Sequence, residues 1–149
     1  MHSSIEYHPK SLTILMAEDD ADDRFLIAET LKNLGCEGEL RLVKDGVELM
    51  DYLNRRGRFA DPELSPLPSL LLLDLNMPKK DGRQALREIK ADPSLEKLRI
   101  VIWTTSDLEE DRALCLGAGA DDYVTKPNSY EALIEEVRSL CRRLLQVSL

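Results

Sequence analysis

The residues with the clearest chemical potential are acids that directly follow apolar runs. Glu18, Asp19 and Asp20 follow the run "LTILMA", and Asp74 follows the four leucines of "SLLLLD". Carboxylates that crowd together repel each other, and at least one takes up a proton unless a cation neutralises the group. An all-oxygen cluster suits a hard ion that keeps some of its waters, which indicates Mg²⁺ rather than zinc. Brought together, these acids would form a Mg²⁺ site.

Two further residues could act on a phosphoryl group. Lys126 follows "DYVT" and supplies a point positive charge that binds an anion, and Thr104 ends "RIVIWT" and supplies a hydroxyl. A carboxylate surrounded by a metal, an ammonium and a hydroxyl forms a phosphoryl-binding site with a nucleophile in it, here Asp74. Each acid alone also has a structural interpretation. Asp20 and Asp23 are then caps of the helix that follows, and Asp74 is a turn residue.

The segments that must position these residues are of two alternating kinds. Apolar residues three and four apart, such as Ile27, Leu31 and Leu34, indicate one face of a helix. Buried strands that alternate with amphipathic helices predict a parallel sheet covered on both faces. We therefore expect an α/β fold, a doubly wound sheet of five strands with five helices. The predicted strands are 12–17, 39–43, 69–74, 99–104 and 122–125.

This fold class would gather the chemical groups at one place. In an open parallel sheet, ligands bind beyond the carboxyl ends of the strands. The acids, Thr104 and Lys126 all stand at predicted strand ends, so we expect them at one edge of the sheet. One connection is long: the segment 54–69 contains Pro62, Pro66 and Pro68. Proline disfavours helix interiors and central strands, which predicts an extended surface loop there.

The composition describes one ordinary globular domain. The 149 residues, 43% hydrophobic and 32% charged, suffice for one core. A formal charge of −8 opposes nucleic-acid binding. No apolar run approaches the ~20 residues that cross a bilayer, and the N-terminus lacks an apolar signal core. The chain has three widely spaced cysteines, Cys36, Cys115 and Cys141, which predict reduced thiols. Together these features lead us to expect a cytoplasmic protein that binds no membrane.

Four motifs in order resemble the receiver domain of two-component response regulators: "ILMAEDD", "LLLLDLNMPKKDG", "IVIWTTS" and "GAGADDYVTKP". The resemblance runs from about Leu12 to Leu145. It implies a flavodoxin-like sheet with strand order 2-1-3-4-5. It also implies a receiver domain at 12–145 between tails at 1–11 and 146–149, with no output domain, as in a stand-alone, chemotaxis-receiver-like regulator.

The resemblance also implies roles for the acids. Asp74 would accept a phosphoryl group from the phosphohistidine of a sensor histidine kinase. Asp19, Asp74 and the backbone carbonyl of Asn76 would hold Mg²⁺, while Glu18 would act mainly through water. Such a chain is no enzyme in the usual sense, because it catalyses only its own phosphorylation and dephosphorylation.

The remaining implied roles concern switching. Thr104 and Lys126 would bind phosphoryl oxygens. Thr104 would move toward the phosphoryl group, and Tyr123 would turn inward into the vacated space. This change would alter the face of the fourth helix, fifth strand and fifth helix for partner binding or dimerisation. The family pattern makes the Lys126–Pro127 peptide a candidate for the cis form, which costs an X–Pro bond only about 0.5–1 kcal/mol.

Several features bear on partners. The "TTS" signature and the long loop resemble small regulators that accompany bacterial phytochromes, so a phytochrome is one candidate kinase. The target would be a downstream protein or a second phosphotransfer partner. Thr105 stands where a small residue is usual and would narrow access to the site. Lys80 and Arg83 stand where apolar residues are common, and indicate solvated surface or a basic partner patch. The final apolar stripe fits core or a homodimer interface: Leu140, Leu144, Leu145 and Val147.

Two other functions remain as alternatives. A haloacid-dehalogenase-like phosphatase also uses an aspartate nucleophile with Mg²⁺, but it requires a second aspartate two residues later, where this chain has Asn76. A pseudo-receiver would bind partners without being phosphorylated. The complete set of acids, together with Thr104 and Lys126, opposes that alternative.

Overall fold

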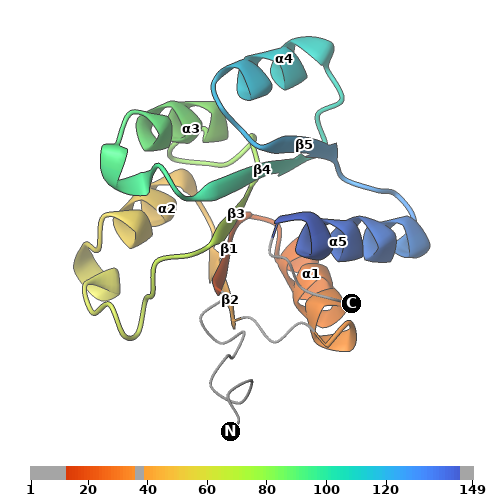
Figure 1. Ribbon diagram of the computed structural model, residues 1–149, viewed down its shortest axis with the longest axis horizontal. Helices are drawn as coiled ribbons and strands as arrows, with labels where there is room; N and C mark the ends of the chain where they lie inside the picture. Colours follow the sequence, from red (N-terminus) through yellow and green to blue (C-terminus); the bar gives the residue numbers. More distant parts are fainter. Residues whose placement is uncertain (1–12, 36–38, 145–149) are drawn as a thin grey trace, which may run out of the picture.

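Five parallel strands form one sheet at the centre of the molecule (Figure 1). The computed structural model describes residues 13–35 and 39–144. The strands lie side by side in the order β2-β1-β3-β4-β5, which confirms the predicted fold class and strand order. Their bounds are β1 (Thr13–Ala17), β2 (Glu39–Val43), β3 (Leu70–Leu73), β4 (Arg99–Thr104) and β5 (Asp122–Thr125).

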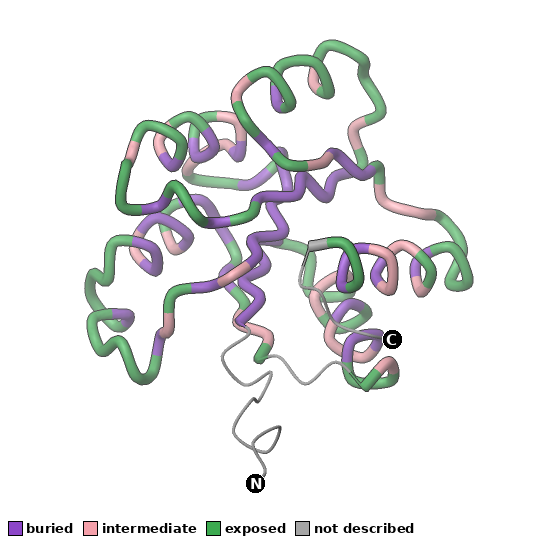
Figure 2. Tube along the Cα trace, viewed as in Figure 1, coloured by how far each residue is buried: buried purple, intermediate pink, exposed green. Residues whose placement is uncertain are grey.

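Helices cover both faces of this sheet. One face carries α1 and α5, and the other carries α2, α3 and α4 (Figure 1). Every residue of β1 and β3 is buried, as Figure 2 shows for the centre of the sheet, because both faces of these strands are covered. The bounds are α1 (Ala21–Asn33), α2 (Gly46–Leu53), α3 (Gly82–Lys90), α4 (Glu109–Gly117) and α5 (Tyr130–Leu144).

The sheet separates two apolar cores. Alternate strand residues point to opposite faces, so Leu15 and Leu71 pack toward α2 and α3, whereas Ile14 and Leu70 pack toward α1 and α5. Trp103 is 2% exposed and belongs to the second core. The strands are thereby held rigidly, and their carboxyl ends have fixed positions.

The segment 54–69 differs from the predicted extended surface loop. It contains a 3₁₀ helix, η3 (Gly57–Phe59), and it buries Phe59 and Ser65. The Phe59 ring lies 5.1 Å from the Tyr52 ring, and the Tyr52 hydroxyl donates a 2.7 Å hydrogen bond to the Pro66 carbonyl. The prolines exclude an α-helix here, but these contacts with α2 hold the segment against the domain.

The expectation of a cis peptide bond at Lys126–Pro127 is wrong. The described chain has no cis peptide bond, so this bond is trans, the form that X–Pro bonds intrinsically favour. Cys115 and Cys141 are buried thiols. Leu140 is buried in the core, whereas the side chains of 144–149, the rest of the C-terminal stripe, lie outside the description, as do Cys36 and the N-terminal tail. None of the described helices is long and apolar enough to cross a membrane.

Candidate functional site

Three acids meet at the carboxyl edge of the sheet. Glu18 and Asp19 follow β1, Asp74 follows β3, and these two strands pair directly. One carboxylate oxygen from each acid lies within 4.8 Å of the other two. Glu18 is 1% exposed and Asp74 is 6% exposed, whereas Asp19 faces the solvent. The structure therefore brings together the acids that the sequence singled out.

Lys126 reaches this cluster from the end of β5. Its Nζ lies 2.6 Å from Glu18 Oε1, 2.8 Å from Asp23 Oδ2 and 3.5 Å from Asp74 Oδ2. Burial alone would lower the pKa of the Lys126 ammonium, but the bonds to Asp23 and Glu18 and the charge of Asp74 together raise it. The ammonium is therefore a permanent positive charge that touches the buried carboxylates.

The carboxylates of the site carry more negative charge than the one ammonium of Lys126 can neutralise. Burial raises the pKa of Glu18 to about 7, and the Asp74 carboxylate adds to this effect while Lys126 opposes it. Near neutral pH the Glu18 carboxyl is therefore partly protonated unless a further cation neutralises the cluster. Because the donors are carboxylate oxygens, and Asp19 opens to solvent, the residues fit a hard divalent cation that keeps some waters.

Asp23 belongs to the site, although the sequence pointed to a cap. The α1 cap is Asp20, whose Oδ1 accepts hydrogen bonds from the backbone N–H groups of Asp22 and Asp23. The Asp23 side chain instead accepts from Lys126 Nζ. The run "EDDADD" does not indicate which acid caps α1 and which acid contacts Lys126 at the end of β5. The position of α1 over the sheet determines both roles.

The cleft above the acids measures about 570 Å³. Asn76 is exposed there, and its N–H donates to Asp74 Oδ1 at 3.2 Å. Thr105 is also exposed at this cleft, at the position where we expect its bulk to narrow access. The lining consists of Glu18, Asp19, Asp20, Ala21, Asp23, Asp74, Asn76, Thr105 and Lys126.

Thr104 lies beneath the cleft rather than in its lining. It is 0% exposed, and its Oγ1 accepts a long hydrogen bond of 3.4 Å from the Ser106 N–H. Tyr123 is 4% exposed, and its hydroxyl donates to the Ser106 carbonyl at 2.9 Å. Burial raises the pKa of the Tyr123 hydroxyl. Both expected switch residues thus contact Ser106, and the Tyr123 ring already points inward.

A charged bridge joins α3 to α4 beside these residues. The Arg83 guanidinium donates to both carboxylate oxygens of Asp111, at 2.9 and 2.8 Å, and also to Asp81. The Ser106 hydroxyl donates to Asp111 at 2.6 Å. Arg83 is therefore neither solvated surface nor a free basic patch. Lys80 likewise pairs with Glu88 at 2.6 Å.

This bridge predicts a pH dependence of stability. Hydrogen bonds from Arg83 and Ser106 lower the pKa of Asp111 to about 2. A lowered acid pKa gives stability that is fully present above the ordinary value of 3.8 and is lost as pH falls toward 2. We expect Asp111→Asn to cost about 1–2 kcal/mol at pH 7. The cost should shrink by pH 3.

Urea unfolding of both proteins at pH 7 and pH 3 measures this cost. Asp107→Asn, at an exposed residue just before α4, is the matched control and should differ little from wild type at either pH. A deficit of Asp111→Asn that stays constant between pH 7 and pH 3 would contradict the assignment.

Comparison with known proteins gives the family. A family model described as the response regulator receiver domain matches residues 14–138. Response regulator Rcp1 from Synechocystis sp. is 37% identical over 137 residues, which cover 92% of this chain and 90% of Rcp1. The crystal structure of its Mn²⁺-bound form has a TM-score of 0.82 and covers 93% of this chain and 98% of that one.

Two further solved structures are similar. The phosphorylated cyanobacterial phytochrome response regulator RcpA is 36% identical with a TM-score of 0.84, covering 93% of this chain and 96% of its own. The receiver domain of the sensor histidine kinase PA1611 from Pseudomonas aeruginosa, with a magnesium ion in its active-site cleft, is 29% identical with a TM-score of 0.69. That comparison covers 91% of this chain and 98% of the other. With the family match over most of its length and the fold described above, this chain belongs to the response regulator receiver domain family.

Proposed function

We propose that Asp74 accepts a phosphoryl group from the phosphohistidine of a sensor histidine kinase, in a reaction that requires Mg²⁺. The observation that carries this proposal is the position of Asp74, a nearly buried carboxylate that lies between two further acids and the ammonium of Lys126. The phosphorylated state of RcpA and the metal ions in Rcp1 and PA1611 support it by similarity.

The residues divide the chemical work. Asp19, Asp74 and the backbone carbonyl of Asn76 would hold Mg²⁺, with Glu18 acting through water. When bound, the ion neutralises charge on the acids and on the phosphoryl oxygens. An oxygen of Asp74 forms the new bond to phosphorus while the bond from phosphorus to the histidine nitrogen breaks, and the imidazole keeps that electron pair. Lys126 Nζ, 3.5 Å from Asp74, binds a phosphoryl oxygen.

Thr104 connects the site to the surface. Its hydroxyl lies below the cleft, so it must move to bind the phosphoryl group. Ser106 bonds to both Thr104 and Tyr123, so a shift of Thr104 reaches Tyr123 through a single residue. We propose that this shift alters the face of α4, β5 and α5, where a target protein, a second phosphotransfer partner or a second copy binds.

The similarity to RcpA makes a bacterial phytochrome our candidate kinase. We further propose that the chain acts as a cytoplasmic regulator in which residues 12–145 form the receiver. Its catalysis would be confined to its own phosphorylation and dephosphorylation.

Replacement of Asp74 tests the proposal. Wild type treated with acetyl phosphate and Mg²⁺ should gain the mass of one phosphoryl group, and Asp74→Asn should not, because the amide is a far weaker nucleophile. Removing Mg²⁺ with a chelator should suppress the gain in wild type. Intact-protein mass spectrometry measures all three. An equal mass gain in Asp74→Asn would contradict the assignment, and steady turnover of phosphomonoesters would favour a phosphatase instead.

A further inference from the structure

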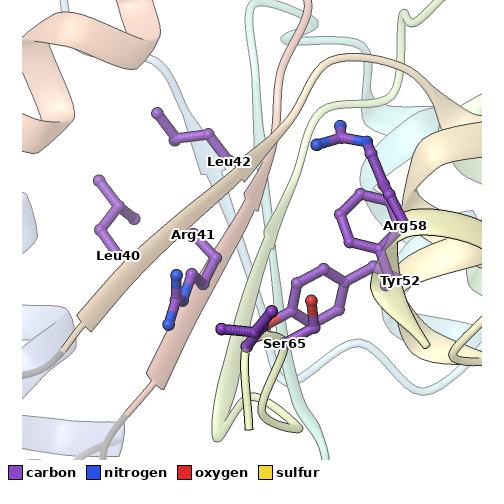
Figure 3. Close-up of a pocket in the computed structure, with 8 residues that line it drawn as sticks. Leu40, Arg41, Leu42, Tyr52, Arg58 and Ser65 are labelled. Atoms are coloured by element: carbon purple, nitrogen blue, oxygen red, sulfur yellow. The ribbon is translucent and has the colours of Figure 1, made fainter. Parts of the chain in front are cut away.

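A second hollow lies along the open edge of the sheet. β2 is an edge strand, because β1 is its one neighbour in the described sheet. A pocket of about 370 Å³ surrounds part of this strand and shares no lining residue with the acidic cleft. Leu40 and Leu42 lie on one side of β2, and Tyr52, Arg58 and Ser65 lie on the other (Figure 3).

A smaller hollow of about 140 Å³ continues this pocket. It shares Leu42 and Arg58 with the first pocket and adds Arg24 and Lys44. Together the two hollows form what we call the β2 groove. Four basic side chains and one acid, Glu48, line the groove, although the whole chain carries a net charge of −8. Arg58 pairs with Glu48 at 2.7 Å, and the three other basic side chains leave the lining net positive on an acidic protein, which favours an acidic ligand.

Arg41, in the middle of β2, has unused donor capacity. Its Nε is buried without a hydrogen-bond partner among the described residues. Its guanidinium makes a long contact of 3.4 Å with Glu39, whose side chain is 53% exposed. A buried donor without an acceptor costs about 1–3 kcal/mol. The Arg41 side chain is 34% exposed, so a carboxylate supplied by a ligand could form a charge-assisted bond with the outer part of the guanidinium.

Apolar surface flanks Arg41. Leu42 is 41% exposed, and Leu64 at the pocket rim is 67% exposed. Successive side chains of a strand point to opposite faces of a sheet. A strand added beside β2 would therefore present alternate side chains to Leu40 and Leu42 on one face and to Arg41 on the other. The matching sequence alternates apolar, acidic and apolar residues.

We propose that the β2 groove binds an extended acidic segment of a partner protein, which adds to the sheet as a sixth strand. This binding site goes beyond the phosphoryl chemistry proposed for Asp74. The unpaired backbone groups of an edge strand supply affinity, and Arg41 selects an acid. A second copy of this chain fits poorly, because symmetric pairing of two β2 strands centred on Arg41 places the two arginines opposite each other.

Peptide binding tests the proposal. The probe is a fluorescein-labelled peptide of alternating valine and threonine with one central glutamate, measured by fluorescence anisotropy with the full chain. Two matched peptides serve as controls, one with glutamine at the centre and one N-methylated at alternate residues. The protein variants are Arg41→Gln and Arg87→Gln. Arg87 is an exposed arginine of α3 outside the groove, so its replacement makes the same charge change.

The expected result is selective. Wild type and Arg87→Gln should bind the glutamate peptide about tenfold more tightly than Arg41→Gln, a difference of ~1.4 kcal/mol. The glutamine peptide should bind all three proteins equally weakly, and the N-methylated peptide should not bind. Phosphorylation of Arg41→Gln by acetyl phosphate should equal that of wild type. This control would show that the variant is folded, and it keeps the peptide test separate from the test of Asp74.

Three results would overturn the proposal. They are a failure of the glutamate peptide to bind wild type, equal binding of the glutamate and glutamine peptides, and binding that survives N-methylation. Sedimentation velocity of wild type and of Arg41→Gln, both without peptide, tests whether a second copy of the chain occupies the groove. A dimer that Arg41→Gln abolishes would assign the groove to a second copy and would also contradict a partner protein.

Discussion

Lys126→Met is expected to lower the free energy of unfolding by about 3–5 kcal/mol and to prevent stable phosphorylation. Lys126 Nζ contacts three carboxylates, and two of these, on Glu18 and Asp74, are almost fully buried. Methionine keeps much of the side-chain volume but leaves the carboxylates without their cation. Uncompensated buried charges are among the most destabilising changes known for single substitutions.

The deficit of Lys126→Met should depend on pH and on Mg²⁺. The pKa of Glu18, already raised to about 7, should rise further without the lysine. A raised acid pKa means that stability falls as pH rises from the ordinary value of 4.5 toward the folded value, so the variant should be more stable at pH 5 than at pH 8. Mg²⁺ should restore part of the loss, because it binds the folded acids preferentially.

Urea unfolding at the two pH values, with and without millimolar Mg²⁺, measures these effects. Lys97→Met, an exposed lysine outside the cleft, is the matched control and should behave as wild type. Equal stability of Lys126→Met and Lys97→Met would show that the lysine is not the counter-charge of the cluster.

Gly82→Ala should be almost as damaging, for a steric reason. Gly82 starts α3, and its N–H donates to the Leu75 carbonyl at 2.9 Å. A Cβ at this position would overlap the Asp74 carbonyl oxygen and would lie 2.7 Å from Leu75 Cα. These are backbone atoms that no rotamer change can move. We expect a loss of about 2–3 kcal/mol in stability, the upper range for overpacking.

The same substitution should slow phosphorylation. The peptide unit of Asp74 must shift to admit the methyl group, and a misplacement of about 1 Å at a reacting group can cost about 10²-fold in rate. Gly117→Ala is the matched control, because nothing lies within 4 Å of a Cβ there and alanine favours the helix. Rates come from the mass gain with acetyl phosphate. A Gly82→Ala protein as stable and reactive as Gly117→Ala would disprove the close-contact argument.

The strands were predictable because their burial is extreme. β3 is four consecutive leucines, and such a run has few uses other than a strand covered on both faces. The predicted and observed strand bounds coincide at seven of their ten ends and differ by one residue at the other three. The segment 54–69 was harder to predict, since the burial of Phe59 depends on Tyr52, a residue of another element. Local proline content carries no information about that contact.

The acids of the site were predictable for a topological reason, whereas their supporting contacts were not. Residues that follow parallel strands share one edge, so the meeting of Glu18 and Asp74 follows from the strand order. The contact of Asp23 with Lys126 and the bridge from Arg83 to Asp111 depend on how helices lie over the sheet and on side-chain direction. Charge and spacing along the chain do not determine those.

The inward ring of Tyr123 has a consequence for how a target could sense phosphorylation. Its hydroxyl donates to the Ser106 carbonyl, and the Ser106 N–H in turn donates to Thr104 Oγ1. A modification shifts a conformational equilibrium only through its differential interaction with the two states. A target that recognises the inward ring would therefore respond to phosphorylation only as far as the phosphoryl group changes the stability of the hydrogen bonds that Ser106 makes. By thermodynamic reciprocity, binding of such a target would favour phosphorylation by the same factor.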